Sequence, residues 1–389
     1  MSVTAAKGFV AAGGSAGIKA AGAPDVAVVA SADGRAVPAA GVFTSNLATA
    51  APVLVSRANL VATAGQAAGV ILTSGNANAA TGQPGLDAAR ALTAVVAEGI
   101  GAELEQILVC QTGLIGIPFP LEVALPRLPA IVAARATGPE AAAAAARAIM
   151  TTDTVSKEVL VQGPGFTVGG MAKGAAMLAP NMATMLAVCT TDAVADPETL
   201  LRCLRAAVNA SFNVMSVDGC TSTNDTVLVL ASGLAATPTE AELTAALTKA
   251  CVSLSEQMVN DAEGATKVSH VRVVGAESDA AAHQAARKVA DSQLVQCSLN
   301  GEDPYWGRVV SELGSAGVAF DPDRVSVAYG GIKVCVDGVA HAHDEAAVRA
   351  HMEGRHIEIV CDLHLGDGQG AVLSTDLGYG YIDENRTTS

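Results

Sequence analysis

The segment from Lys173 to Thr191, KGAAMLAPNMATMLAVCTT, constrains the fold of this chain more than any other part of it. Its centre is a five-residue apolar run, Met185 to Cys189, bounded by Pro180-Asn181 before it and by Thr190-Thr191-Asp192 after it. A short apolar run between turn-forming residues is typical of a buried strand. Thr184 therefore stands where a turn becomes a strand.

Thr184 at that junction has the layout of a self-cleaving nucleophile. Its hydroxyl oxygen can attack the carbonyl carbon of Ala183, which moves the acyl group from nitrogen to oxygen, and water then releases it. The new N-terminal threonine carries its own base, because a free α-amine has a pKa of roughly 7.7 to 8.0 and can accept the hydroxyl proton. The alternative interpretation, an ordinary threonine that opens a core strand, fits these residues equally well.

The distribution of histidine favours a mechanism without one. All seven histidines lie at position 270 or later, and none falls in the first 269 residues. A threonine whose own amine is the base needs no histidine. Nucleotide-binding motifs are also missing: Val168 stands where a third glycine would complete G-x-G-x-x-G after Gly163 and Gly165. We therefore expect no cofactor and no metal.

Length and composition bound the class of protein. A chain of 389 residues is long enough for two lobes. Its net charge of −15 and few aromatic residues disfavour a nucleic-acid partner, which selects basic and stacking surfaces. No run of 18 apolar residues and no basic, leucine-rich leader is present, so we expect a cytoplasmic protein without a membrane partner. The eight cysteines form no C-x-x-C pair, which favours reduced thiols.

Short strands and alanine-rich helices follow one another in irregular order. The pattern predicts strands at Val26–Ala30, Gly69–Leu72, Gln106–Cys110 and His356–Leu363, helices at Leu86–Glu98, Pro139–Met150 and Glu240–Glu263, a helix capped by Asp196-Pro197, and a hairpin at Val325–Val336 that turns on Gly330-Gly331. Because this is not a run of regular βαβ units, we expect an α+β architecture of layered mixed sheets.

Five further residues are candidates for the site. Thr112-Gly113 follows a predicted strand, and glycine lets backbone N–H groups approach a developing oxyanion; the alternative is a simple turn. Lys173 is a lone cation among apolar residues, which suggests a carboxylate ligand or else a lysine at the surface. Glu263 closes the longest helix pattern, where the helix dipole disfavours a carboxylate, so it either grips an ammonium group or is a solvated side chain. Thr151 belongs to a Thr-Thr-Asp-Thr cluster that lines a pocket or forms a turn.

Taken together, the motifs resemble one family. They are GVFTSN at 41, SGNANAATG at 74, QTGLIG at 111, AIMTTDT at 148, MAKGAAMLAPNMATML at 171, STNDT at 222, DAEGATK at 261, DPYWGR at 303 and DLHLGDG at 362. In this order and over nearly the whole chain they are similar to the ornithine acetyltransferases of arginine biosynthesis, also called bifunctional glutamate N-acetyltransferases.

The resemblance implies self-cleavage between Ala183 and Thr184, which gives an N-terminal chain of residues 1–183 and a C-terminal chain of residues 184–389 that stay together. Acetyl would pass from N2-acetylornithine to Thr184 and then to glutamate in a ping-pong mechanism, with no cofactor and with acetyl-CoA as a second donor in some members. The positions that match the family's site are Thr112 and Gly113 for the oxyanion hole, Ala183 and Thr184 for cleavage, and Thr151, Lys173, Thr184, Glu263, Asn385 and Ser389 for substrate binding.

The resemblance also implies a fold of two lobes built from mixed sheets layered with helices, similar to certain self-processing aminopeptidases, and a dimer of cleaved pairs. Three positions depart from the family. Gln111 stands where the family usually has serine, Asn76 stands where a second glycine is common, and Ser389 follows Asn385 by four residues instead of five.

Two other functions remain as alternatives. A self-processed amidase or aminopeptidase would give the acyl group to water, and a non-catalytic amino-acid-binding protein would stay uncleaved. The dependence of ornithine release on glutamate distinguishes the first alternative from the transferase. The motifs are the same in members that use acetyl-CoA and in members that do not, so they leave the donor open.

Overall fold

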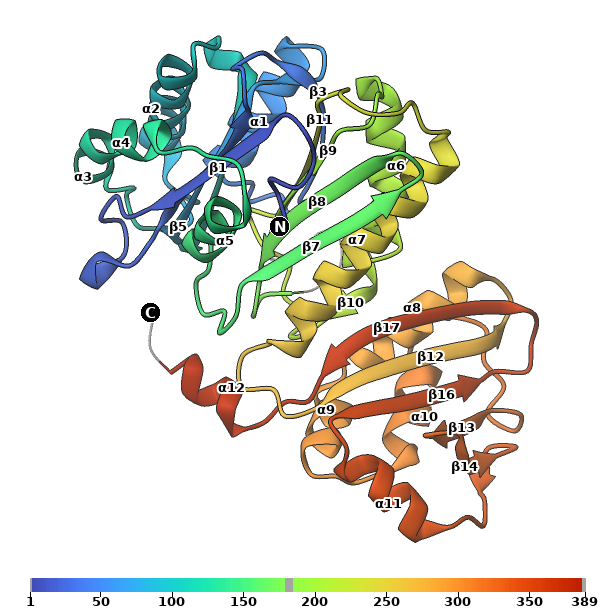
Figure 1. Cartoon of the computed structure of the whole chain (residues 1–389). Coiled ribbons are helices and arrows are strands. Elements are labelled where there is room, and N and C mark those ends of the chain that lie inside the picture. Colours follow the sequence, from blue (N-terminus) through green and yellow to red (C-terminus); the bar gives the residue numbers. More distant parts are fainter. Residues whose placement is uncertain (1, 179–184, 387–389) are drawn as a thin grey trace. The chain divides into compact units, whose positions relative to one another are not determined.

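The computed structural model describes residues 2–178 and 185–386 (Figure 1). The chain splits into two compact units: unit 1 is Met1–Asn213 with Thr221–Met258, and unit 2 is Val214–Cys220 with Val259–Ser389. The predicted cleavage point divides the chain differently, since most of the first 75 residues after Thr184 belong to unit 1. The fold class is the expected one, mixed β-sheets with helices packed on them.

Unit 1 contains two sheets. The four-stranded sheet has the order β1-β2-β5-β6, with β1 Phe9–Gly14, β2 Val26–Ser31, β5 Gly69–Asn76 and β6 Ile107–Leu114. The six-stranded sheet has the order β4-β3-β11-β9-β8-β7, with β3 Val37–Phe43, β4 Gln66–Ala67, β7 Lys157–Gly163, β8 Phe166–Lys173, β9 Leu186–Thr191 and β11 Thr226–Ala231. Both sheets are mixed, because β5–β6 and β9–β11 are parallel pairs while their other neighbours are antiparallel.

The four-stranded sheet has a buried core on each of its faces. Leu72 and Leu108 of the four-stranded sheet pack with Val188 and Leu228 of the six-stranded sheet in one buried cluster. The opposite face of the four-stranded sheet, represented by Ile71, packs against helices. Since successive side chains of a strand point to opposite faces, a strand of continuous apolar residues is buried on both. This explains why the strands of this unit are apolar runs in the sequence.

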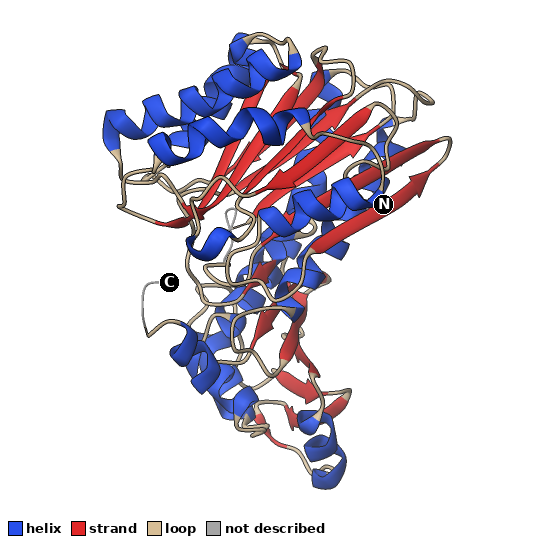
Figure 2. Cartoon of the chain, turned by 60° about the vertical axis from the view of Figure 1, so that its left-hand side comes forward, coloured by secondary structure: helices blue, strands red, loops and turns tan. Residues whose placement is uncertain are grey.

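The helices of unit 1 run alongside its sheets (Figure 2). They are α1 Ala51–Ala62, α2 Gly82–Ile100, α3 Leu121–Ala124, α4 Leu128–Ala133, α5 Pro139–Ala148, α6 Pro197–Asn209 and α7 Glu240–Asn260, with 3-10 turns at Ala20–Gly22, Leu104–Gln106, Leu125–Arg127 and Phe212–Val214. The Asp196 side chain accepts a hydrogen bond from the N–H of Thr199, so the predicted cap of α6 is confirmed.

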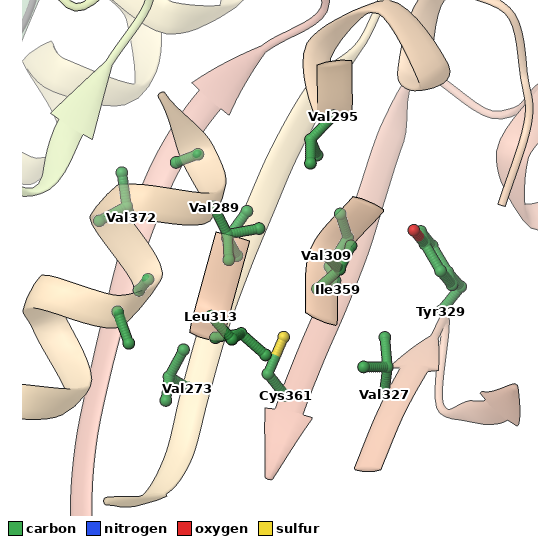
Figure 3. Close-up of a cluster of buried hydrophobic side chains, with 14 of the residues drawn as sticks. Val273, Val289, Val295, Val309, Leu313, Val327, Tyr329, Ile359, Cys361 and Val372 are labelled. Atoms are coloured by element: carbon green, nitrogen blue, oxygen red, sulfur yellow. The ribbon is translucent and has the colours of Figure 1, made fainter. Parts of the chain in front are cut away.

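Unit 2 is built on a seven-stranded sheet of order β10-β17-β12-β16-β13-β14-β15. Its strands are β10 Met215–Ser216, β12 Val268–Ala276, β13 Ser326–Tyr329, β14 Ile332–Val336, β15 Val339–Ala340, β16 His356–Asp362 and β17 Gly368–Thr375, and its helices are α8 Asp279–Ala290, α9 Gln293–Asn300, α10 Trp306–Gly314, α11 Glu345–Glu353 and α12 Tyr379–Glu384. Figure 3 shows its core, in which Val289 and Leu313 from helices meet Val273 and Ile359 from the sheet.

Most predicted elements are confirmed, including the hairpin β13–β14 and the strand β16. Two local predictions are wrong. Glu263 does not close a helix, because α7 ends at Asn260 and Glu263 lies in the following turn, where Gly264 has a φ of +62°. Thr112 and Gly113 do not form a loop, because β6 continues to Leu114 and pairs with the similarly long β5. Polar residues are accepted in a strand when a neighbouring strand supplies the backbone hydrogen bonds.

Candidate active site

Thr112 and Gly113 lie at the carboxyl end of the parallel pair β5–β6. In the register, Ser74 pairs with Thr112 and Gly75 pairs with Gly113. Gly113 has a φ of +131°, and a Cβ atom there would lie 2.3 Å from the carbonyl carbon of Gly75. Glycine is therefore required both by the backbone conformation and by the close approach of the neighbouring strand.

Lys173 brings a buried cation to Thr112. Its Nζ donates to Oγ1 of Thr112 at 3.3 Å, and the lysine is only 3% exposed. Lys173 ends β8, and the register pairs it with Leu186, the first residue of β9. Two of the predicted site residues, Thr112 and Lys173, are thus in contact. Ala183, Thr184 and Ser389 lie outside the described residues.

Asp153 organises the segment that carries Thr151. Its carboxylate accepts hydrogen bonds from the N–H of Thr151 at 2.9 Å and from the N–H of Gly174 at 2.8 Å, and it pairs with Nζ of Lys157 at 2.5 Å. Burial alone raises the pKa of Asp153, but the positive charges of Lys173 and Lys157 outweigh it and lower the pKa to about 2. Asp153 therefore links the Thr151 segment to the end of β8.

A second buried acid lies beside Met185, the first residue described after the predicted cleavage point. Oδ1 of Asp225 accepts the N–H of Met185 at 2.9 Å. Its other oxygen, Oδ2, has no hydrogen-bond partner among residues 2–178 and 185–386. Burial raises the pKa of Asp225 well above its usual value, and the Met185 N–H and the charge of Lys173 offset this only in part. An acid of this kind holds its proton more readily than a surface carboxyl does.

Gln111 and Asn76, the two departures from the family near the predicted oxyanion hole, belong to a buried hydrogen-bond network. Gln111 accepts from Nδ2 of Asn78 at 2.8 Å through its side chain, and its backbone carbonyl accepts from Nδ2 of Asn224 at 2.9 Å. The side-chain oxygen of Asn76 accepts the N–H of Asn78 at 2.8 Å. Because the polar atoms named here have partners, Gln111 and Asn76 are compatible with an ordered strand end.

Glu263 and Asn385 form a separate group in unit 2. Nδ2 of Asn385 donates to Oε2 of Glu263 at 2.8 Å, and Asn385 caps the C-terminal end of α12. The structure thus brings these two predicted residues together, although 122 positions separate them. Thr112, Gly113, Thr151 and Lys173 belong to unit 1.

Sequence reasoning missed the two buried acids and Lys157. Asp153 and Asp225 were visible only as members of the motifs AIMTTDT and STNDT, with no role assigned to them, and Lys157 carried no signal. Their burial depends on pairing between distant segments, which a single sequence does not reveal. Within the described residues, no group of three His, Cys, Asp or Glu side chains could hold a metal ion, and no helix is long and apolar enough to cross a membrane.

A backbone N–H at a strand end, a neighbouring hydroxyl and a buried lysine are groups that acyl-transfer enzymes use as hydrogen-bond donors to a developing oxyanion. A family model described as the ArgJ family matches residues 10–387. The arginine biosynthesis bifunctional protein ArgJ of Mycolicibacterium paratuberculosis is 48% identical over 394 residues, which cover 100% of this chain and 96% of that protein.

The protein of the same name from Streptomyces coelicolor is 45% identical over 390 residues, which cover 100% of both chains. A solved structure of an ornithine acetyltransferase from Mycobacterium tuberculosis, complexed with ornithine, is 41% identical and covers 46% of this chain and 94% of its own, with a TM-score of 0.42. This chain belongs to the ArgJ family, and the resemblance expected from its motifs is confirmed.

Proposed function

We propose that this chain is an acetyltransferase of arginine biosynthesis that moves an acetyl group from N2-acetylornithine to glutamate through an ester on Thr184. The family assignment carries the reaction class. The observation that carries the site is the contact between Lys173 and Thr112 at the end of β8, directly opposite the start of β9.

Maturation begins with attack of the Thr184 hydroxyl on the carbonyl carbon of Ala183. The peptide C–N bond breaks as the C–O bond forms, and the nitrogen gains a proton and becomes the α-amine of Thr184. Water then hydrolyses the ester and leaves a carboxylate on Ala183 and a hydroxyl on Thr184. The new amine accepts the hydroxyl proton in each later attack.

The six-stranded sheet explains why the two pieces would stay together. Strands β9 and β11 belong to the C-terminal piece, and they lie between β3 and β8 of the N-terminal piece. Separation would break two full ladders, β3–β11 and β8–β9, and expose their apolar side chains. We therefore propose that the cleaved pair is the functional protomer. We also propose that two such pairs form a dimer, as the resemblance to the family implies.

Acetyl transfer then takes two half-reactions. Thr184 attacks the acetyl carbonyl of N2-acetylornithine, the C–N bond breaks, and ornithine leaves with the proton from the hydroxyl. The amine of glutamate attacks the resulting ester, gives up a proton and restores the threonine hydroxyl. The N–H of Gly113 and the hydroxyl of Thr112 donate to the oxyanion in both steps. Lys173 already donates to Oγ1 of Thr112, which leaves the hydroxyl hydrogen of Thr112 for the oxyanion.

The remaining predicted residues bind the substrate. We propose that Lys173 attracts a substrate carboxylate, that Glu263 binds an ammonium group and that Asn385 holds Glu263 in place. We propose that Thr151, whose N–H is held by Asp153, and Ser389 also bind the substrate. No cofactor takes part, because the ester on Thr184 conserves the acyl group; acetyl-CoA is a second acyl donor in this proposal. The eight cysteines are free thiols, which supports a cytoplasmic location.

The test combines mass spectrometry with a donor and acceptor assay. We expect purified protein to give two fragments that meet at the 183–184 bond, and Thr184→Ala to remain full length. Continued release of ornithine, beyond the single turnover that acetylates Thr184, will require glutamate, and acetyl-CoA with glutamate will give N-acetylglutamate. An intact chain with full activity would refute the mechanism. Continued turnover of N2-acetylornithine without any acceptor would favour the amidase, and binding without turnover would favour the amino-acid-binding protein.

A further inference from the structure

The Glu263–Asn385 pair depends on two segments that are far apart in the chain. Glu263 lies in the turn after α7, and Asn385 follows α12 near the end of the chain. The two segments touch through backbone: a Cβ atom on Gly264 would lie 2.1 Å from the carbonyl carbon of Gly380. Glu263 and Asn385 are both at least partly exposed, so their own hydrogen bond competes with water. Other contacts must therefore hold the turn at Glu263 against the C-terminal segment.

Asp376 is the residue at which these segments meet. It follows the last residue of β17, is 4% exposed, and precedes the tail that carries Asn385. Its Oδ1 accepts the N–H of Thr266 at 2.8 Å and the N–H of Lys267 at 2.8 Å. Its Oδ2 accepts the hydroxyl of Thr266 at 2.6 Å and Nδ2 of Asn300 at 2.7 Å. Four donors therefore converge on one buried carboxylate.

These four bonds join three pieces of unit 2. Thr266 and Lys267 continue the turn that begins at Glu263, Asn300 ends α9, and Asp376 begins the C-terminal tail. Hydrogen bonds to a carboxylate are shorter and about twice as strong as those between neutral groups. A carboxylate that receives all of them fixes the turn relative to the tail, whereas the single bond between Glu263 and Asn385 is exposed to water.

We propose that Asp376 is a positioning residue that sets Glu263 for recognition of the substrate ammonium group. This inference rests on the proposed function, because it takes Glu263 as the ammonium-binding group. Asp376 itself does not touch substrate; it acts through the turn at residues 263–267. Its loss is expected to weaken recognition of acyl donors that carry an ammonium group and to spare donors that lack one.

The test compares two acyl donors on the cleaved enzyme. N2-acetylornithine carries the ammonium group, whereas p-nitrophenyl acetate is a neutral, activated acetyl ester that offers the nucleophile an acetyl group without an ammonium group. For Asp376→Asn we expect KM for N2-acetylornithine to rise by about tenfold or more, since small misplacements of a binding group cost up to about 10²-fold. We expect kcat/KM for p-nitrophenyl acetate to change by less than about twofold. Equal losses for both donors would show a purely structural role and overturn the proposal, as would an unchanged KM.

Two further variants complete the design. Asp279→Asn is the matched control, because Asp279 accepts the N–H of Gln369 at the other end of β17 and should leave both donors unaffected. Thr266→Val removes only the hydrogen bond from the Thr266 hydroxyl to Asp376, and it replaces Asp376→Asn in the test if that variant does not fold. Its KM for N2-acetylornithine should rise about threefold, the effect of losing one modest hydrogen bond. No selective rise in this variant would overturn the proposal. Wild-type enzyme without acetyl transfer would instead refute the proposed function.

Discussion

Replacement of Asp153 by asparagine tests the electrostatic reading of the site most directly. Asp153 and Lys157 have fully buried side chains 2.5 Å apart, and Lys173 is buried nearby. Asparagine is nearly the same size but carries no charge, so Lys157 loses its carboxylate contact with residue 153 and Lys173 loses a nearby negative charge. Breaking a buried pair in this way costs about 3–5 kcal/mol.

The magnitude follows from the contacts. The amide of asparagine also turns a donor toward the N–H of Thr151 or of Gly174, and a buried donor without an acceptor costs roughly 1–3 kcal/mol. These costs overlap, so we expect a total near 4 kcal/mol for unit 1. In urea this corresponds to a midpoint shift of roughly 1 M, for a slope of about 3 kcal/mol per M.

The assay is urea unfolding in the Thr184→Ala background, so that all variants have the same covalent structure. Far-UV circular dichroism follows both units, whereas the single tryptophan, Trp306, lies in unit 2 and is an internal control. Adding Lys157→Met should recover at least about 1 kcal/mol relative to the sum of the single variants. A loss below about 1 kcal/mol for Asp153→Asn, or strict additivity, would refute the buried-pair argument.

Three other predictions follow from the site. The pKa of Asp153 is lowered from its ordinary value of 3.8 to about 2 in the folded protein. The carboxylate therefore stabilises the fold by about 2 kcal/mol above pH 4, and this stabilisation is lost between pH 4 and pH 2. Acid unfolding of the wild type should show this loss, and acid unfolding of Asp153→Asn should not. The kcat of Gly113→Ala should be lower by about 10²-fold or more, because the added side chain would collide with Gly75. Gly116→Ala is the control, since a Cβ atom there meets open space. Equal activity of the two variants would exclude the oxyanion role. Cleaved wild-type protein should elute as one species in native chromatography and separate into residues 1–183 and 184–389 only in denaturant; separation under native conditions would contradict the shared sheet.

The elements that the sequence predicted well are those in which one pattern repeats over many residues. The apolar run before Thr190 became β9, and the heptad-like spacing after Glu240 became α7. The end of α7 was misjudged by three residues, because Gly264 is a good stop signal and Glu263 reads as helical until the partner segment at Gly380 is known. Local patterns state what a segment prefers, and tertiary contacts decide where it ends.

The site was predicted unevenly for the same reason. Thr112 and Lys173 were found separately, but only the pairing of strands puts their side chains 3.3 Å apart. Asp376 gave no signal, since an aspartate after a strand is ordinary turn material until four donors are seen around it. Buried polar networks are assembled from residues distant in sequence, and without that pairing each member looks like a surface residue.

If the chain is cleaved as proposed, the alternation of strands in the six-stranded sheet changes the kind of equilibrium that describes the cleaved protein. Once the bond before residue 184 is broken, loss of this sheet is no longer a unimolecular event, since it sets free two polypeptides that must meet again. The melting temperature of the mature enzyme should then rise with protein concentration, and refolding should become second order, while an uncleaved variant would show neither behaviour.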